Sequence, residues 1–319
     1  MIDAQQDIEI EVKQRHETSI VAFFLSLLGA LLVVSLFRSI FESNFREINT
    51  NAPWFVAITG IILFSVFFGV WLIFACRHAK FGRELLREFD IKPVPVREGL
   101  LLTLLGFVFI VAFLLVQEGS IRLFSLAGYS ASIGIDEMSN FGEYILVMIG
   151  LAVMPAIVEE LIFRGMIQRG LMKYGAVAAI LGSALLFSLF HMSPAQTVFQ
   201  FIMGVGFAWI YIRTKNLMYP IILHFVNNAT IITYTYITQS VGLEDSSAVF
   251  GATTSIAMVL LAVTGAFLVI RLIGLLKEGK EGRITGQMTE RKPFMSMENF
   301  GFFVCAIISI TLWVAIAFA

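Results

Sequence analysis

Charge is the property that this chain has least of. Charged residues make up 14% of its 319 residues and apolar residues 58%, and the mean hydropathy is +0.86. A water-soluble domain of this length does not need so much apolar surface. The net charge of −1 gives no electrostatic reason to expect a nucleic-acid partner. The composition therefore predicts an all-α, polytopic transmembrane helical bundle that has the lipid bilayer as its surroundings.

Cysteine is equally scarce. The chain has two cysteines, Cys76 and Cys305, which lie far apart in the sequence. Two such residues are too few for a cysteine metal cage or a disulfide framework. We interpret both as ordinary apolar thiols.

Long apolar runs make up much of the chain. A transmembrane helix needs about 20 apolar residues, and eight to nine segments meet or approach this length. The ninth is the least certain, because a long charged loop precedes it. The expected spans lie near residues 19–37, 54–76, 99–117, 143–163, 174–191, 196–212, 217–238, 248–273 and 300–318.

The basic residues predict the orientation of these spans. Every Lys and Arg except Arg38, Arg46 and Arg122 falls on one side, mainly in the 77–98 and 271–299 loops. Cytoplasmic loops carry such an excess of positive charge. We expect an integral protein of the plasma membrane with a cytoplasmic N-terminus.

Three regions differ in what their spans contain. Residues 1–140 comprise a polar tail and three spans without an embedded charge. Residues 141–240 comprise four spans and contain the embedded polar residues. Residues 241–319 comprise one or two spans and a basic loop. The middle region is therefore the expected functional core.

Few ionisable residues lie deep inside an apolar span. Of 23 acidic residues only Glu159 and Glu160 do so, and of four histidines only His191 and His224 do so. Ionisable side chains inside a membrane are costly and usually functional. These four residues are the first candidates for an intramembrane polar active-site cavity.

Helical spacing gives the two glutamates different neighbours. Residues four apart share a helix face, so Glu160 can pair with Arg164. Glu159 points about 100° away and is left without this partner. A carboxylate in an apolar site suits a general base. A Glu–Arg pair alone, however, is as readily explained as a contact that joins helices.

The histidines also have neighbours four residues away. His224 shares a face with Asn228, and these two side chains could hold a developing oxyanion. His191 shares a face with Phe187. A lone membrane histidine is often only an interhelical hydrogen-bonding group, so the argument depends on the clusters occurring together.

Taken in order, the three clusters resemble the motifs of the CPBP intramembrane protease family, which includes CAAX prenyl proteases and bacterial bacteriocin-processing or immunity (ABI) proteins. The matching motifs are Glu159-Glu160-x-x-x-Arg164, Phe187-x-x-x-His191 and His224-x-x-x-Asn228. Each motif is weak alone, whereas the ordered set is specific.

The resemblance implies a function and a role for each residue. Glu159 and His191 would hold and activate a water, and His224 and Asn228 would stabilise the oxyanion. The supporting residues would be Glu160, Arg164 and Phe187. The implied activity is that of an intramembrane endopeptidase, and the implied substrate is a membrane-associated peptide or protein.

Metal dependence stays open at this point. Glu159, His191 and His224 could make a zinc site with one open position, and the family has been described both as metalloproteases and as glutamate proteases. Nothing resembles H-E-x-x-H. We favour a site without a cofactor, because Asn228 beside His224 fits an oxyanion pair better than a ligand pair.

The main alternative function is a non-catalytic immunity or receptor scaffold that uses the same polar residues structurally; a transporter is a weaker alternative. Simple topology also raises a difficulty. With residues 164–173 in a cytoplasmic loop, Glu159 lies near the cytoplasm and His191 near the opposite face. The 174–212 hairpin must then be short, tilted or buried in protein for the motifs to meet.

Overall fold

The structure is a computed structural model. It describes residues 49–241 apart from 77–78, 127, 129–134 and 192, together with scattered residues of 26–45 and residues 307, 310 and 311. No strand occurs among these residues. The helices are α2 (Pro53–Ala75), α3 (Arg83–Glu88), α4 (Val96–Ser125), α5 (Phe141–Met148), α6 (Met154–Ile162), α7 (Arg169–Leu171), α8 (Ala176–Phe190), α9 (Pro194–Thr214) and α10 (Met218–Val241).

The fold class predicted from composition is confirmed. Within the described part of the chain, three helices are long and apolar enough to cross a membrane, namely Pro53–Ala75, Phe141–Tyr174 and Gln196–Thr214. The chain is therefore an integral membrane protein built as a helical bundle. The number of spans stays a prediction, because those near 248–273 and 300–318, and much of 19–37, lie outside the described residues.

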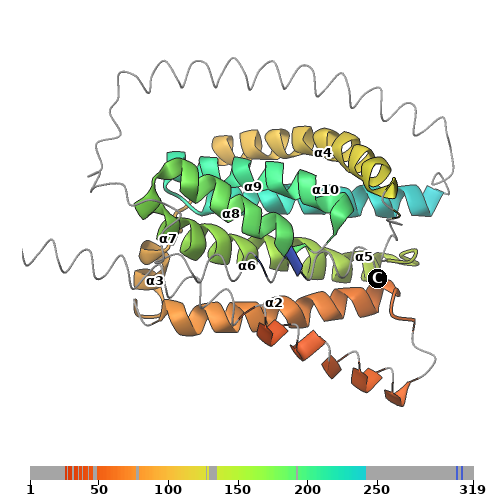
Figure 1. The fold of residues 1–319 in the computed structure, drawn as a ribbon. Coiled ribbons are helices and arrows are strands. Elements are labelled where there is room, and N and C mark those ends of the chain that lie inside the picture. The colour runs from red at the N-terminus through yellow and green to blue at the C-terminus, as the bar shows by residue number, and fades with distance from the viewer. Residues whose placement is uncertain are drawn as a thin grey trace, which may run out of the picture.

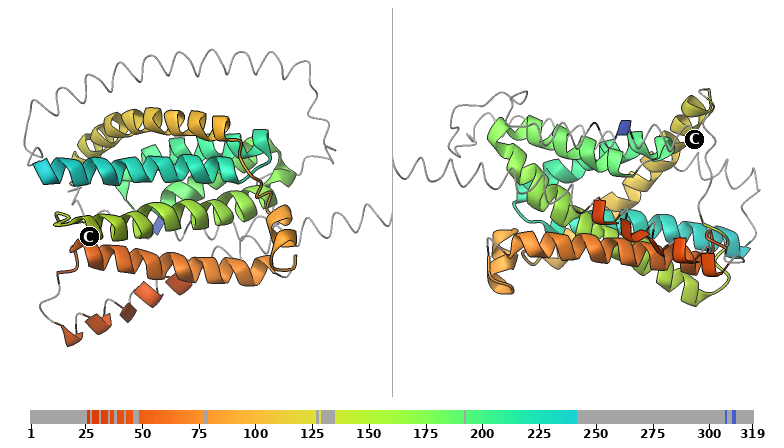
Figure 2. Two further views of the ribbon diagram at one scale, coloured as in Figure 1. Left: turned by 180° about the vertical axis from the view of Figure 1, so that it is seen from behind. Right: turned by 60° about the horizontal axis from the view of Figure 1, so that its bottom comes forward.

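The helices are arranged in layers. α4, α9 and α10 lie on one side, α8 and the long Phe141–Tyr174 helix lie in the middle, and α2 lies on the other side (Figure 1). The view from behind in Figure 2 shows the same order. The backbones of α2 and the middle layer nearly touch, because a Cβ at Gly150 would lie 2.5 Å from the carbonyl oxygen of Ala57. The middle layer is thus covered from both sides.

Two π-helical segments interrupt the long middle helix. They are η1 (Ile149–Val153) and η2 (Phe163–Gln168), which flank α6, and a 3₁₀ turn, η3 (Met172–Tyr174), ends the helix. π-bulges of this kind are rare and occur frequently at functional sites. Both glutamates lie in the short α-helical stretch between the two bulges.

The predicted cytoplasmic loop at 164–173 is wrong. Residues 164–171 continue the helix, and the side chains of Arg164 and Gln168 are fully buried. Arg164 Nη2 donates to the carbonyl oxygen of Gly204 at 3.2 Å, and Gln168 Nε2 donates to that of Ala208 at 2.8 Å. Polar side chains that bond backbone carbonyls of a neighbouring helix can stay inside the bundle. The turn to the next helix therefore comes at Gly175.

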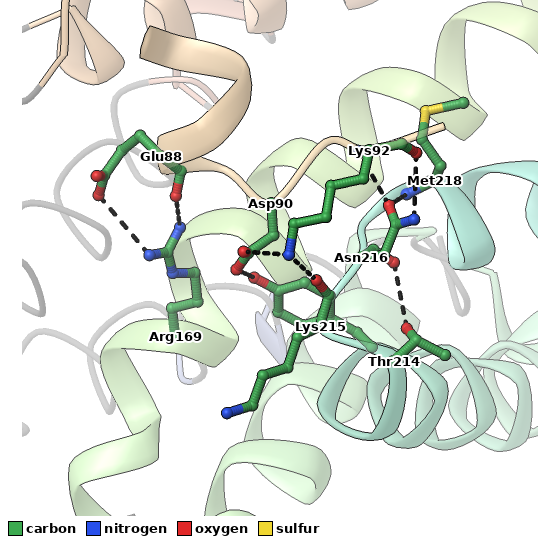
Figure 3. A network of polar contacts seen from close by, with 9 residues as sticks. Glu88, Asp90, Lys92, Arg169, Thr214, Lys215, Asn216 and Met218 are labelled. Carbon is green, nitrogen blue, oxygen red and sulfur yellow. Dashed lines mark hydrogen bonds and ion pairs between the residues drawn. The ribbon is translucent and has the colours of Figure 1, made fainter. Parts of the chain in front are cut away.

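A polar network closes the end of the bundle where α3 and the α9–α10 turn meet (Figure 3). Asn216 accepts from Lys92 N at 3.2 Å and donates to Lys92 O at 3.1 Å, so its side-chain amide pairs like a peptide group. Leu217 N donates to Asp90 O at 2.9 Å. Arg169 donates to the carbonyl oxygen of Glu88, whose carboxylate also lies 3.7 Å away. The α3–α4 connection is thereby fixed to the middle layer and to α10.

Candidate active site

Glu160 and Arg164 form the buried ion pair that their spacing predicts. Arg164 Nη1 lies 2.8 Å from Glu160 Oε1, and both side chains are fully buried. The guanidinium also lies over the ring of Phe187, 4.4 Å from its centroid. A buried charge needs a partner and further hydrogen bonds. Arg164 has both, since its other terminal nitrogen donates to Gly204 on α9.

His224 lies between the two glutamates. Its Nδ1 donates to Glu160 Oε1 at 2.9 Å, so this one oxygen accepts from both His224 and Arg164. Its Nε2 lies 3.9 Å from Glu159 Oε2. That separation is too long for a hydrogen bond, but it suits two groups that share one water. Glu160 therefore orients the imidazole with Nε2 toward Glu159.

Glu159 lies outside the Glu160–Arg164 ion pair. Its side chain is 95% buried on α6, and its Oε2 has no hydrogen-bond partner among the residues that the structure describes. Buried carboxylate oxygens are normally paired, so an unpaired one calls for a functional explanation. Glu160 Oε2 also lacks a partner, but Glu160 Oε1 accepts from both Arg164 and His224, so only Glu160 forms the ion pair that the spacing predicts.

Phe187 places the Phe187-x-x-x-His191 motif beside His224. Its ring is fully buried on α8 and lies 5.0 Å from the His191 ring and 5.7 Å from the His224 ring, centroid to centroid. His191, at the end of α8, is half-buried, and its Nδ1 donates to the carbonyl oxygen of Phe187 at 2.9 Å. The Nε2 atom of His191 is then the nitrogen left for a substrate or a water.

The turn at Gly175 resolves the difficulty with the depth of His191. Glu159 lies sixteen residues before Gly175, and His191 lies sixteen residues after it. The two helices run antiparallel and contact each other, as the Phe163 and Phe187 rings show with centroids 5.3 Å apart. Equal distances along two antiparallel helices give similar depths. The expected separation by most of the bilayer core was wrong, because it placed the turn at 164–173.

Asn228 makes a contact that the spacing did not predict. Its Nδ2 donates to the carbonyl oxygen of Leu151 at 3.1 Å. Pro155 has no N–H, so Leu151 lacks the donor that a continuous α-helix would provide. Asn227 Nδ2 in turn donates to Asn228 Oδ1 at 3.1 Å. These two contacts leave the second N–H of Asn228 as its remaining donor.

Sequence reasoning missed two buried polar residues near these motifs. Gln168 follows Arg164 by four residues and repeats its contact with α9 one turn further along. Asn227 follows His224 by three residues, and its side chain is almost fully buried. Both share a helix face with a motif residue, and this spacing is the signal that could have found them.

The donor set does not gather into a metal site. Among the described residues no group of three or more His, Cys, Asp or Glu side chains could hold a metal ion. His224 Nδ1 is occupied by Glu160, and its Nε2 is 3.9 Å from the nearest Glu159 oxygen. Zinc ligands lie about 2.0–2.2 Å from the metal on a tetrahedron. Among the described residues Glu159, His191 and His224 do not form a three-ligand group, and we derive no step through zinc.

Comparison with protein families agrees with the resemblance seen in the motifs. Residues 141–230 match the family described as type II CAAX prenyl endopeptidase Rce1-like. The match contains all three motifs and lies within the expected core of 141–240. Comparisons with curated proteins and with solved structures found no match.

Proposed function

We propose that this protein is an intramembrane endopeptidase that hydrolyses a peptide bond of a membrane-associated peptide or protein, with Glu159 as the general base. The observation that carries the proposal is the unpaired Oε2 of Glu159, buried 3.9 Å from His224 Nε2. The family match at residues 141–230 supports the same class of reaction. A base must be free, and Glu160 is not free because it accepts from both Arg164 and His224.

The first step is attack by water. We propose that a water donates one hydrogen to the Glu159 carboxylate and the other to His191 Nε2. The Nδ1–H of His191 is already directed at Phe187 O, which leaves Nε2 as an acceptor. As the water oxygen bonds to the scissile carbonyl carbon, Glu159 takes the proton. The product of this step is a tetrahedral oxyanion.

Two donors are placed to stabilise this oxyanion. Asn228 has one N–H that is not used by Leu151. A proton on His224 Nε2 would make a second donor, with the Glu160 carboxylate held at Nδ1 on the other side of the ring. Removal of a single oxyanion donor typically costs a factor of about 10²–10³ in rate. The carbon–nitrogen bond then breaks as Glu159 returns its proton to the leaving amine.

Access to the site is proposed from the α8–α9 turn. His191 and Asn228 are half-buried, whereas Glu159 and His224 are almost fully buried. A hydrolytic site needs water, which the bilayer core does not supply. We infer that the substrate enters laterally from the bilayer past His191, and that water reaches the site through a polar cavity that opens to the cytoplasm or the inner leaflet.

The basic residues at one end of the bundle support a cytoplasmic N-terminus. The end closed by the network of Figure 3 carries α3, Lys92, Arg169 and Lys215. An excess of Lys and Arg is typical of cytoplasmic loops. We propose a plasma-membrane location with this end in the cytoplasm.

The function is tested by comparing the membrane peptidomes of cells that carry wild-type protein, Glu159→Gln or Glu137→Gln. Both variants remove one carboxylate, but Glu137 is an exposed loop residue. We expect the cleavage products of wild-type cells to persist with Glu137→Gln and to vanish with Glu159→Gln. Products that persist in all three would sink the proposal and favour the non-catalytic scaffold.

A further inference from the structure

The helix α3 differs from all other described helices in its direction. The long helices run along the bundle, whereas α3 lies across its end in every view (Figures 1 and 2). A helix that lies across the end of a transmembrane bundle is parallel to the membrane plane. This is the orientation of interfacial amphipathic helices, whose apolar and basic side chains lie at the headgroup layer.

One face of α3 is anchored to the bundle. Leu85 is buried, as is Phe89 directly after the helix. The Phe89 ring lies 4.9 Å from Trp71 and against Gly165, where an added Cβ would lie 3.1 Å from Phe89 Cδ1. Glu88 holds Arg169. This face therefore contacts residues next to Arg164.

The opposite face presents two arginines. At 100° per residue, Arg83 and Arg87 lie opposite Leu85, and Leu86 lies beside them. Both arginines are exposed, and no ion pair or hydrogen bond of either side chain occurs in the described part of the chain. Arg164 and Arg169, by contrast, are both paired. The Arg83 and Arg87 guanidiniums are thus available for an external anion.

Large apolar side chains flank these arginines. Phe81 is 78% exposed and Leu86 is 46% exposed. Phe81 directly follows Lys80, and the one acidic residue among residues 80–87 is the exposed Glu84, beside three basic residues. Exposed aromatic and aliphatic residues beside arginines match the boundary between acyl chains and phosphates.

We propose that residues 80–87 form a binding surface for anionic phospholipids of the adjacent leaflet. Arg83 and Arg87 contact the phosphates, and Phe81 and Leu86 insert at the acyl boundary. This surface is independent of the proteolytic site. It lies on a segment outside the family match at 141–230. Phe89 and Glu88, which directly follow this surface, contact Gly165 and Arg169 within the matched region. Bound lipid would therefore stabilise the position of α3 against η2 and α7.

The proposal can be tested on the whole protein in vesicles. Phe81→Cys is placed in a background in which Cys76 and Cys305 are replaced, and is labelled with bimane. Quenching by brominated phosphatidylglycerol and by brominated phosphatidylcholine gives the relative binding constant of the two lipids at this place. We expect strong quenching by both lipids and a preference for phosphatidylglycerol that decreases with salt.

Arginine variants decide whether α3 carries the preference. Each arginine near an anionic surface increases the binding constant for anionic lipid about fivefold. Arg83→Gln with Arg87→Gln should therefore lower the preference for phosphatidylglycerol over phosphatidylcholine by up to about thirtyfold. Arg97→Gln with Arg213→Gln is the matched control, since both residues are exposed and basic. We expect the control pair to change the preference less than threefold.

Two outcomes would overturn the proposal. Equal losses in both double variants would show only a general charge effect. A bimane at position 81 that aqueous iodide quenches and brominated lipid does not would show that this surface faces water, as a surface for a soluble protein partner would. Because neither readout requires substrate cleavage, a failure here is distinct from a failure of the proposed function.

Discussion

Asn228 donates its side-chain amide to the carbonyl oxygen of Leu151, 3.1 Å away. This bond joins α10 to η1 where Pro155 removes a backbone donor. Asn228→Ala would remove this contact between α10 and η1, and the loss of one hydrogen bond typically costs about 0.5–1.5 kcal/mol. We expect Asn228→Ala to lower both the thermal stability of the purified protein and its activity.

A second substitution separates these two effects. Pro155→Ala would allow a continuous α-helix in which the N–H of residue 155 bonds the Leu151 oxygen, so in the Asn228→Ala background it should restore part of the stability and none of the activity. Thermal unfolding in detergent and a cleavage assay measure the two quantities. If Pro155→Ala stabilises Asn228→Ala no more than it stabilises the wild type, the Leu151 contact does not matter for stability.

The role of Glu159 predicts a clean loss of function. Glu159→Gln keeps the shape of the side chain, but an amide cannot take the proton of the attacking water. We expect cleavage to be abolished while the membrane level and the unfolding temperature stay close to wild type, because Glu159 has no hydrogen-bond partner at Oε2 to lose. Turnover by the purified Glu159→Gln protein would remove Glu159 as the base.

Arg164 predicts the opposite pattern. Arg164→Ala leaves Glu160 buried without its ion pair and removes the donor to Gly204. Loss of one partner of a buried ion pair costs about 3–5 kcal/mol. We expect reduced accumulation in the membrane as well as reduced activity, with Arg213→Ala as the exposed control. An Arg164→Ala protein that is as stable as wild type and merely slower would show that the pair has no structural role.

Metal dependence can be measured directly. The described donors do not gather around a common point, and we expect active, purified protein to contain substoichiometric zinc and to retain activity after chelation. A zinc site would need deprotonated ligands and would lose activity to chelators. Stoichiometric metal whose removal and return track activity would reverse this expectation.

The length of α8 predicts how far the α8–α9 turn reaches. Fifteen residues of α-helix from Ala176 to Phe190 extend only about 22 Å, less than the roughly 30 Å of a bilayer core. Single cysteines at Ser193 and Gln196, in a protein without Cys76 and Cys305, should resist an impermeant thiol reagent added outside. Rapid labelling at both positions would show instead that the turn reaches the outer surface.

Sequence reasoning predicted the helices well where apolar length decides them. The predicted span 54–76 corresponds to α2 at Pro53–Ala75, and 196–212 corresponds to α9 at Pro194–Thr214. For 143–163 it predicted the start of the helix but ended it too early, because Arg164 was read as a residue at the membrane surface. The carbonyl oxygens of Gly204 and Ala208 that keep this helix end buried belong to a helix forty residues away, and no local pattern announces such partners.

The candidate site shows the same division. Spacing predicted the Glu160–Arg164 pair and the unpaired Glu159, since both follow from positions on one helix. It did not predict that His224 lies between the glutamates or that Asn228 contacts Leu151. Those contacts depend on two π-bulges and on how α10 packs against α6, which are properties of tertiary packing.

The equal spacing of Glu159 and His191 about Gly175 limits how this protein can change in length. Inserting or deleting one residue on either side of the turn would rotate the affected side chain by about 100° and shift it by about 1.5 Å. Such a change would separate the two residues unless a π-bulge or a compensating change in the other helix absorbed it. Active variants that differ in length between Glu159 and His191 should therefore carry paired changes.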